Sequence, residues 1–200
     1  FIFLNVSPVF GASPDKNSKE IIANSENFFE GKFRNIKTTY TNLRTLERKS
    51  TLKEWFFPPE DKNPLGPLPT IKFKGQDLTE GKFVWFGHST LLMKTEGLVV
   101  MTDPVFNRAS PLPSFSSKSK SSFFNGKPFV FENPILIEDL PKVDVVIISH
   151  DHYDHLDSKA IKDLSNLVDH FIVPLGVGAH LERWGVDKIK LLSLTGMKAR

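Results

Sequence analysis

The fold of this chain is decided by one stretch, in which an apolar run leads into a loop of histidines and aspartates: Val143-Asp144-Val145-Val146-Ile147-Ile148-Ser149-His150-Asp151-His152-Tyr153-Asp154-His155-Leu156-Asp157. The first six residues are mostly β-branched and apolar, which predicts a buried β-strand over 143–148. Imidazole and carboxylate side chains together suit borderline divalent metals, and zinc above all. The stretch therefore predicts a strand that carries a metal site at its end.

The spacing of these side chains predicts two metal positions. On an extended backbone alternate residues project to the same side, so His150 and His152 can reach one ion. Asp154 and His155 follow a bend and can reach a second ion beside the first. Two divalent ions about 3.5–4 Å apart can share a water and lower its pKa, which produces a hydroxide for hydrolysis.

An ordinary role has to be weighed for each of these residues. A single histidine near a strand end is usually a surface or packing residue. That role does not suit three histidines and three aspartates in one loop, because no core packing needs them together. The remaining carboxylates, Asp151 and Asp157, are candidates to anchor the second ring nitrogen of a ligand histidine.

The pattern His150-x-His152-x-Asp154-His155 resembles the signature of the metallo-β-lactamase superfamily. This resemblance implies an α/β fold, the αββα sandwich of that superfamily, of which the chain would hold the N-terminal part. It also implies a zinc cofactor, with two ions in complete enzymes. The four residues of the pattern would be the metal ligands, and Asp154 would also be catalytic.

Four further segments resemble one branch of that superfamily, the branch of N-acylphosphatidylethanolamine-hydrolysing phospholipase D and similar bacterial proteins. They are Phe83-Val84-Trp85-Phe86-Gly87-His88-Ser89-Thr90, Val99-Val100-Met101-Thr102-Asp103-Pro104-Val105-Phe106, Arg108-Ala109-Ser110-Pro111 and Phe171-Ile172-Val173-Pro174-Leu175-Gly176. The resemblance spans about residues 28 to 192. It implies a phosphodiesterase that uses a metal-bound hydroxide on N-acylphosphatidylethanolamine-like lipids.

Two alternatives to this activity stay open. The ligand set alone does not choose between carbonyl and phosphoryl substrates, so a lactonase or another ester hydrolase of the superfamily is the first. The second is an inactive, truncated metal-binding fragment. A complete family member adds a third histidine, a bridging aspartate and a last histidine, whereas this chain has no histidine after His180. Where the branch tends to read Leu-Asp-Trp-Tyr-Glu, this chain reads Leu194-Thr195-Gly196-Met197-Lys198-Ala199, and a one-base frameshift near Ser193 is our hypothesis for that difference.

Composition limits the partners. The chain has 200 residues, of which 40% are hydrophobic, enough for one core. Its net charge is +3, and the Lys and Arg residues are spread along the chain, which gives no case for nucleic-acid binding. The expected partner is a lipid or small-molecule ester, with peripheral membrane contact; the oligomeric state stays open. The absence of cysteine excludes disulfides and thiolate ligands.

Three regions are expected along the chain. Residues 1–14 read as a signal-peptide remnant, with a disordered or strand-like terminus as the alternative, so export, membrane association and a cytoplasmic location all stay open. Residues 15–70 form a polar N-terminal arm with weak helical periodicity only over 41–54. Residues 71–200 form an incomplete hydrolase domain, and the Ser/Lys-rich stretch 114–122 reads as a surface loop.

Local patterns predict the elements around the metal loop. Strands are expected over 83–86, 91–95, 98–102 and 171–174, with a hairpin turn at Glu96-Gly97. Asp157 or Ser158 is expected to cap a helix over 158–167, and a second helix over 178–184 should end at Gly185.

Four other residues have weaker signals. Asp103 follows an apolar strand and is expected to hydrogen-bond a ligand histidine or to order the metal loop, although it could merely cap a turn. His88 is expected either to line the pocket or to bond the backbone as a structural residue. His170 and His180 match no ligand spacing and are expected to be surface or packing residues.

Overall fold

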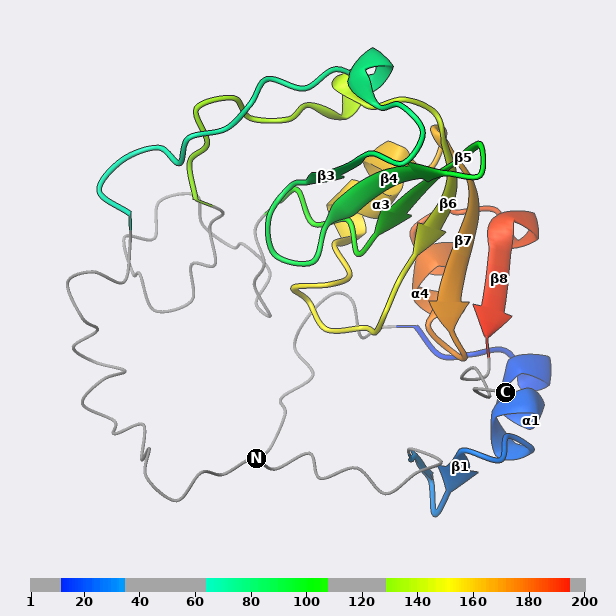
Figure 1. Ribbon diagram of the computed structural model, residues 1–200. Helices are drawn as coiled ribbons and strands as arrows, with labels where there is room; N and C mark the ends of the chain where they lie inside the picture. Colours follow the sequence, from blue (N-terminus) through cyan, green and yellow to red (C-terminus); the bar gives the residue numbers. More distant parts are fainter. Residues whose placement is uncertain (1–11, 35–63, 108–128, 195–200) are drawn as a thin grey trace, which may run out of the picture.

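The computed structural model describes residues 12–34, 64–107 and 129–194, and its centre is a six-stranded sheet (Figure 1). The strands follow one another in chain order: β3 (Phe83–Trp85), β4 (Leu91–Thr95), β5 (Leu98–Thr102), β6 (Val143–Ile147), β7 (Val168–Pro174) and β8 (Leu191–Leu194). The first three strands are antiparallel, and β5 to β8 are parallel. The sequence predictions of β4 and β5 are confirmed to the residue, and that of β6 to within one residue at its end.

A tight turn joins β4 to β5, as the sequence predicts. Glu96 and Gly97 both have positive φ, 51° and 78°, which matches the twist of the paired strands. The carboxylate of Glu80 accepts hydrogen bonds from both backbone amides, at 2.6 and 3.2 Å. This turn fixes the register in which Leu92 faces Met101.

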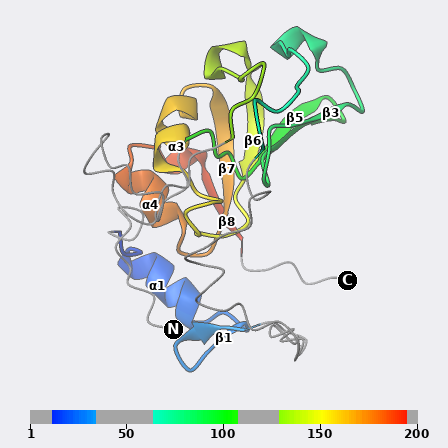
Figure 2. The ribbon, with the colours of Figure 1, turned by 90° about the vertical axis from the view of Figure 1, so that its left-hand side faces the viewer.

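Helices connect the parallel strands and cover one face of the sheet. The helix α3 (Ser158–Leu164) joins β6 to β7, and α4 (Gly178–Arg183) with the 3-10 turn η6 (Lys188–Lys190) joins β7 to β8. Figure 2 shows both helices on the same side of the sheet. Beneath them a fully buried row crosses four strands: Leu92, Met101, Val146 and Phe171. Burial of each such side chain contributes roughly 1.5–3 kcal/mol, so this row is a main source of stability.

The helix α3 is shorter than the sequence predicts. It begins after Asp157, one of the two predicted caps, but ends at Leu164 rather than at 167. Leu167 turns back instead and donates its amide to the carbonyl of Leu164 at 2.8 Å. The ammonium of Lys190 then binds the carbonyls of Ser165 and Val168, both at 2.8 Å, which stabilises this early end.

The other face of the sheet is also apolar. Phe83 and Trp85 of β3 are 72% and 65% exposed there, and further large apolar side chains of this face are partly exposed: Leu98, Ile147, Leu192 and Leu194. A sheet with apolar residues on both faces is typical of a layer that is covered on both sides. The parallel half of this sheet therefore has the pattern of an inner layer of a sandwich.

Outside the six-stranded sheet lie short elements that the sequence did not predict. They are the helix α1 (Lys16–Ala23), the hairpin β1 (Phe28–Phe29) with β2 (Lys32–Phe33), and the 3-10 turns η3 (Gly75–Asp77) and η5 (Ile137–Asp139). Asp15 caps α1 by accepting from the amide of Ser18 at 2.7 Å. The same carboxylate pairs with Lys188 at 2.8 Å, which links the start of α1 to the turn η6 that precedes β8.

Several predictions lie outside the described residues, namely the start of the signal-like segment at 1–11, the periodicity at 41–54, the surface loop at 114–122 and the sequence beyond Leu194. Among the helices that are described, none combines the length and the apolar character needed to cross a bilayer.

Candidate metal centre

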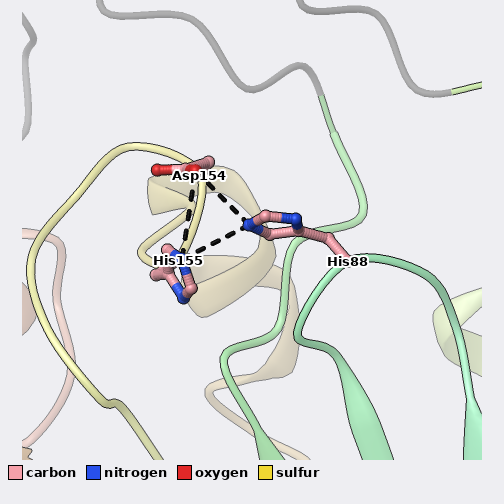
Figure 3. Close-up of side chains that lie close together, drawn as sticks. All are labelled: His88, Asp154 and His155. Atoms are coloured by element: carbon pink, nitrogen blue, oxygen red, sulfur yellow. Dashed lines mark hydrogen bonds and ion pairs between the residues drawn. The ribbon is translucent and has the colours of Figure 1, made fainter. Parts of the chain in front are cut away.

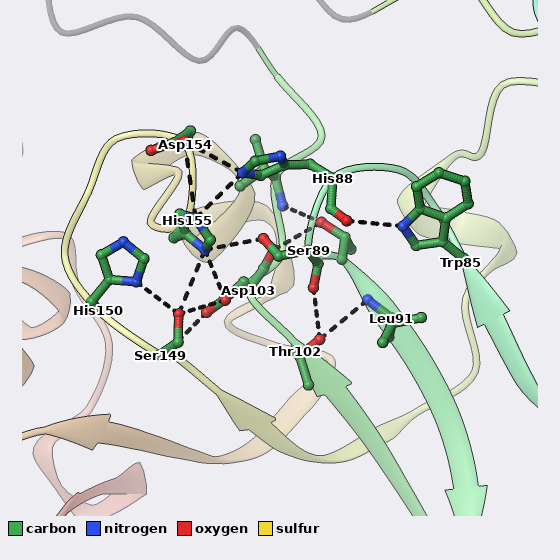
Figure 4. Close-up of polar contacts among 12 residues, drawn as sticks. Trp85, His88, Ser89, Leu91, Thr102, Asp103, Ser149, His150, Asp154 and His155 are labelled. Atoms are coloured by element: carbon green, nitrogen blue, oxygen red, sulfur yellow. Dashed lines mark hydrogen bonds and ion pairs between the residues drawn. The ribbon is translucent and has the colours of Figure 1, made fainter. Parts of the chain in front are cut away.

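The predicted site residues gather at one edge of the sheet (Figure 4). Asp103 directly follows β5, and the loop 148–157 follows β6. Because β5 and β6 are parallel, their carboxyl ends meet at the same edge. The loop between β3 and β4 joins them there, since Leu91, the first residue of β4, pairs with Thr102 at the end of β5.

Asp103 is the hub of this edge. It is buried, with a φ of 36°, and its two carboxylate oxygens are both used. Oδ1 accepts from the backbone amide of Ser149 at 2.7 Å, and Oδ2 accepts from the Ser149 hydroxyl at 2.6 Å. Oδ2 also lies 2.9 Å from Nδ1 of His155. One carboxylate thus ties the start of the metal loop to the histidine near its end.

The contact with Asp103 sets the tautomer of His155. A carboxylate accepts, so Nδ1 of His155 carries the hydrogen and Nε2 keeps its lone pair. Ser89 Oγ lies 3.0 Å from the same Nδ1, so two polar groups contact this nitrogen. Nε2 lies 3.9 Å from Oδ2 of Asp154 (Figure 3). The lone pair of Nε2 therefore lies on the side of Asp154, where the two side chains could bind the same metal ion.

The first two histidines of the loop form a second group beside His155. The ring centroids of His150 and His155 are 4.0 Å apart, and those of His150 and His152 are 4.5 Å apart. Burial lowers the pKa of His150, and electrostatic repulsion from the neighbouring rings of His155 and His152 lowers it further. His150 is therefore neutral at neutral pH, which is the form that binds a metal.

His88 lies in this group too, on the side of Asp154. Its Nε2 is 3.3 Å from Nε2 of His155 and 3.3 Å from Oδ2 of Asp154. These three side chains each offer one donor atom, and the atoms all lie within 4.8 Å of one another (Figure 3). The sequence left His88 either as a pocket residue or as a structural residue bonded to the backbone, and it gave no ligand spacing for it. The contact arises only when the hairpin β3–β4 is brought to the edge where β6 ends.

The two remaining loop carboxylates point to other partners. Oδ1 of Asp157 accepts from the amides of Lys159 and Ala160 at the start of α3. Its Oδ2 accepts from the amide and side chain of Asn107, at 2.9 and 3.0 Å. Asp157 thus builds the loop, and no hydrogen bond to a histidine is found for it among the described residues. The charge of Asp151 acts on His180, whose pKa it raises against the larger lowering by burial.

The histidines without ligand spacing behave as predicted. His170 is exposed on β7. His180 is buried in α4 and stacks on Trp184, with ring centroids 6.1 Å apart.

Comparison with known proteins shows the family of this chain. Residues 99–197 match the family model of the beta-lactamase superfamily domain. The chain belongs to the metallo-β-lactamase superfamily, and the predicted α/β fold class is confirmed. An uncharacterized protein of Mycobacterium tuberculosis is 36% identical over 178 residues, which are 85% of this chain and 44% of that protein. The N-acyl-phosphatidylethanolamine-hydrolyzing phospholipase D 1 of Caenorhabditis elegans is 34% identical over 152 residues, 73% of this chain and 40% of that enzyme.

The chain spans less than half the length of these two relatives. Among solved structures, CmlA, a diiron beta-hydroxylase from Streptomyces venezuelae, covers 55% of this chain and 20% of its own chain at 22% identity. Its TM-score is 0.40, which is too low to bear on the metal or the reaction of this chain.

The donors found at the site fit a metal ion of the kind that this superfamily binds. Imidazole and carboxylate side chains converge, and the lone pair of His155 is directed at its neighbours by Asp103. The chain has no thiolate to offer. Such an N,O donor set suits a borderline divalent cation such as zinc or iron.

Proposed function

We propose that this chain is a zinc-dependent hydrolase that cleaves the phosphodiester bond of N-acylphosphatidylethanolamine-like lipids. The observation that carries this proposal is the convergence of His155, Asp154 and His88, with His150 packed against His155, at the carboxyl edge of the sheet. Such a cluster beside Asp103, which fixes a histidine tautomer, supports the assignment of a metal centre.

The substrate class is proposed from the relatives. The phospholipase D of Caenorhabditis elegans is named for the hydrolysis of N-acyl-phosphatidylethanolamine, and the similarity to it covers 73% of this chain. A lipid substrate would bring the chain to a membrane surface, so we include peripheral membrane contact in the proposal.

In the proposed reaction, water adds to phosphorus and the bond from phosphorus to the oxygen of the N-acylethanolamine breaks, which releases phosphatidic acid and N-acylethanolamine. A bound divalent cation would lower the pKa of the attacking water and polarise the phosphoryl oxygen. His150, His152, Asp154 and His155 would hold the metal. The partly exposed carboxylate of Asp154 would also accept a hydrogen bond from the water and orient it.

The test has two measurements on the purified 200-residue chain. Elemental analysis gives the zinc content, and phosphorus NMR follows N-acylphosphatidylethanolamine in mixed micelles. We expect bound zinc, and we expect phosphatidic acid to appear only with zinc. The double variant His152→Ala plus His155→Ala should lose both the metal and the turnover, whereas His170→Ala, which removes an exposed histidine of β7, should keep both.

Other outcomes reject parts of the proposal. Unchanged metal content in the double variant would refute the ligand assignment. Zinc binding with turnover of a lactone or carboxylic ester but not of the phospholipid would identify an ester hydrolase instead. Zinc binding without turnover of any of these substrates would identify the chain as a non-catalytic metal-binding protein.

A further inference from the structure

We propose that His88 is itself a metal ligand, which completes a three-donor site with Asp154 and His155. This inference rests on the metal-dependent function proposed above, but it assigns a residue that lies more than sixty positions before the metal loop. It makes the hairpin β3–β4 part of the metal site rather than only a wall of the pocket.

The distances are those of a metal site. Three ligand atoms on one tetrahedral zinc, each about 2.0–2.1 Å from it, lie about 3.3–3.4 Å from one another. Nε2 of His88 is 3.3 Å from Oδ2 of Asp154 and 3.3 Å from Nε2 of His155. The third separation, between His155 and Asp154, is 3.9 Å, so one side chain has to move by about half an ångström to make the site regular.

The two facing nitrogens also need a shared partner. His155 donates from Nδ1 to Asp103, so a neutral His155 presents a lone pair at Nε2. Asp154 presents carboxylate oxygens toward the same point. If Nε2 of His88 carried a hydrogen, it could bond to only one of the two acceptors that face it, the lone pair of His155 or the carboxylate of Asp154. A bound cation would instead be coordinated by all three side chains at once. The arrangement therefore favours a cation over a simple hydrogen bond.

The alternative role for His88, a structural residue bonded to the backbone, does not fit its surroundings. Its side chain is 55% exposed, so it adds little packing. Its ring contacts His155 and Asp154, and among the described residues no hydrogen bond joins the ring to a backbone atom. Its φ is 46°, in the left-handed region, and an exposed ion pair is too weak to account for such a conformation.

The loop that carries His88 is held in place from several sides. The indole of Trp85 donates to the carbonyl of His88 at 2.9 Å. The buried hydroxyl of Thr90 donates to the carbonyl of Asp103 at 2.8 Å, and the hydroxyl of Thr102 donates to the carbonyl of Ser89 at 2.8 Å. The loop is thus joined to the residues around Asp103, which also fix His155. Ligands held in advance in this way lose little freedom when a metal binds.

The experiment compares His88→Gly with His170→Gly by metal binding, without reference to turnover. Glycine suits the positive φ at position 88 and leaves a space for a free imidazole. Competition with a coloured chelator gives the zinc affinity and stoichiometry, and the visible spectrum of bound cobalt reports its ligands. Circular dichroism and urea unfolding establish that both variants are folded.

We expect His88→Gly to weaken the affinity by more than the roughly 10–100-fold that removal of an outer partner costs, and to change the cobalt spectrum. Free imidazole, at a concentration that leaves the wild-type spectrum unchanged, should restore the spectrum in His88→Gly. His170→Gly should bind like the wild type.

Two results would overturn the inference. One is unchanged affinity and spectrum in His88→Gly. The other is a weaker affinity with an unaltered spectrum per bound ion and no restoration by imidazole, which would make His88 a positioning residue. A failure of the proposed lipid hydrolysis would leave both metal measurements unaffected, so the two proposals fail separately.

Discussion

At the scale of single residues, Asp103 does more than any other side chain to shape the site. Its two oxygens accept three hydrogen bonds, from the amide and the hydroxyl of Ser149 and from His155. Asp103 is buried, and its positive φ is an unfavourable backbone conformation for a residue other than glycine. The hydrogen bonds of its side chain offset that cost. The sequence predicted that Asp103, at the end of β5, would accept a hydrogen bond. It did not predict which histidine would donate, because that depends on how β5 and β6 pair.

We predict that Asp103→Asn weakens metal binding by roughly 10–100-fold. The amide keeps one acceptor oxygen, and its NH₂ group then faces a donor, either on Ser149 or on His155. A buried donor without a partner costs about 1–3 kcal/mol, so the free energy of unfolding should fall by a similar amount. Chelator competition and urea unfolding measure the two effects. The control is Asp169→Asn, a surface carboxylate paired with Lys142; if it weakened metal binding equally, the effect would not be specific to the site.

His180 gives a prediction on pH. Burial lowers its pKa, the charge of Arg183 lowers it further, and the charge of Asp151 only partly opposes this. The unfolded chain therefore takes up a proton near pH 6.5 while the folded chain does not, so the free energy of unfolding falls as the pH drops below about 6.5. This loss continues down to the lowered pKa, at about 1.4 kcal/mol for each unit of lowering.

The variant His180→Phe should remove that part of the pH dependence. A phenyl ring retains the stacking on Trp184 and does not titrate, and it removes the buried Nδ1, for which no hydrogen-bond partner is found among the described residues. Urea unfolding at pH 7 and pH 5 should show a smaller loss of stability in the variant than in the wild type. An identical loss in both proteins would mean that His180 does not titrate as inferred.

At the scale of elements, the sequence predicted what depends on neighbours in the chain. The strands β4 and β5 and the turn at Glu96-Gly97 follow from alternation and turn chemistry, and they are confirmed. The helix α1 was missed because it buries none of its residues, and β8 was missed because three of its four residues are exposed. The sequence of α1 is mostly polar, and the four residues of β8 are too few to show a period, so both elements depend on contacts with distant segments. His88 meets His155 for the same reason, across sixty-seven positions.

The cap of α3 gives a prediction at this scale. We expect Asp157→Ala to lower the free energy of unfolding by about 1–2 kcal/mol through the lost cap, with a further loss where Asn107 is released. Metal binding should weaken less than in Asp103→Asn, because Asp157 accepts no hydrogen bond from a histidine among the described residues. The control Asp163→Ala removes an exposed partner of Lys159 and should cost under about 1 kcal/mol. Equal losses in the two variants would show that the cap does not stabilise α3.

At the scale of the whole molecule, the described residues cover one face of the sheet well and leave the other partly open. The helices α3 and α4 bury the row through Leu92 and Phe171, whereas Trp85, Leu98 and Leu192 on the opposite face stay partly exposed. Contiguous apolar surface of this kind in water promotes association. The strands β3 and β8 at the two edges of the sheet also leave backbone groups open to pairing.

We therefore predict that the isolated 200-residue chain self-associates at micromolar concentration and binds the dye ANS. The double variant Leu98→Lys plus Leu192→Lys should reduce both effects with little change in the free energy of unfolding, because both side chains are about half-exposed. Leu92→Lys, on the covered face, should instead unfold the chain, since it buries an unpaired charge. Sedimentation and dye fluorescence measure the association. A chain that is monomeric without ANS binding would mean that this face is covered in solution, and the lysine variant would then lose stability instead of gaining solubility.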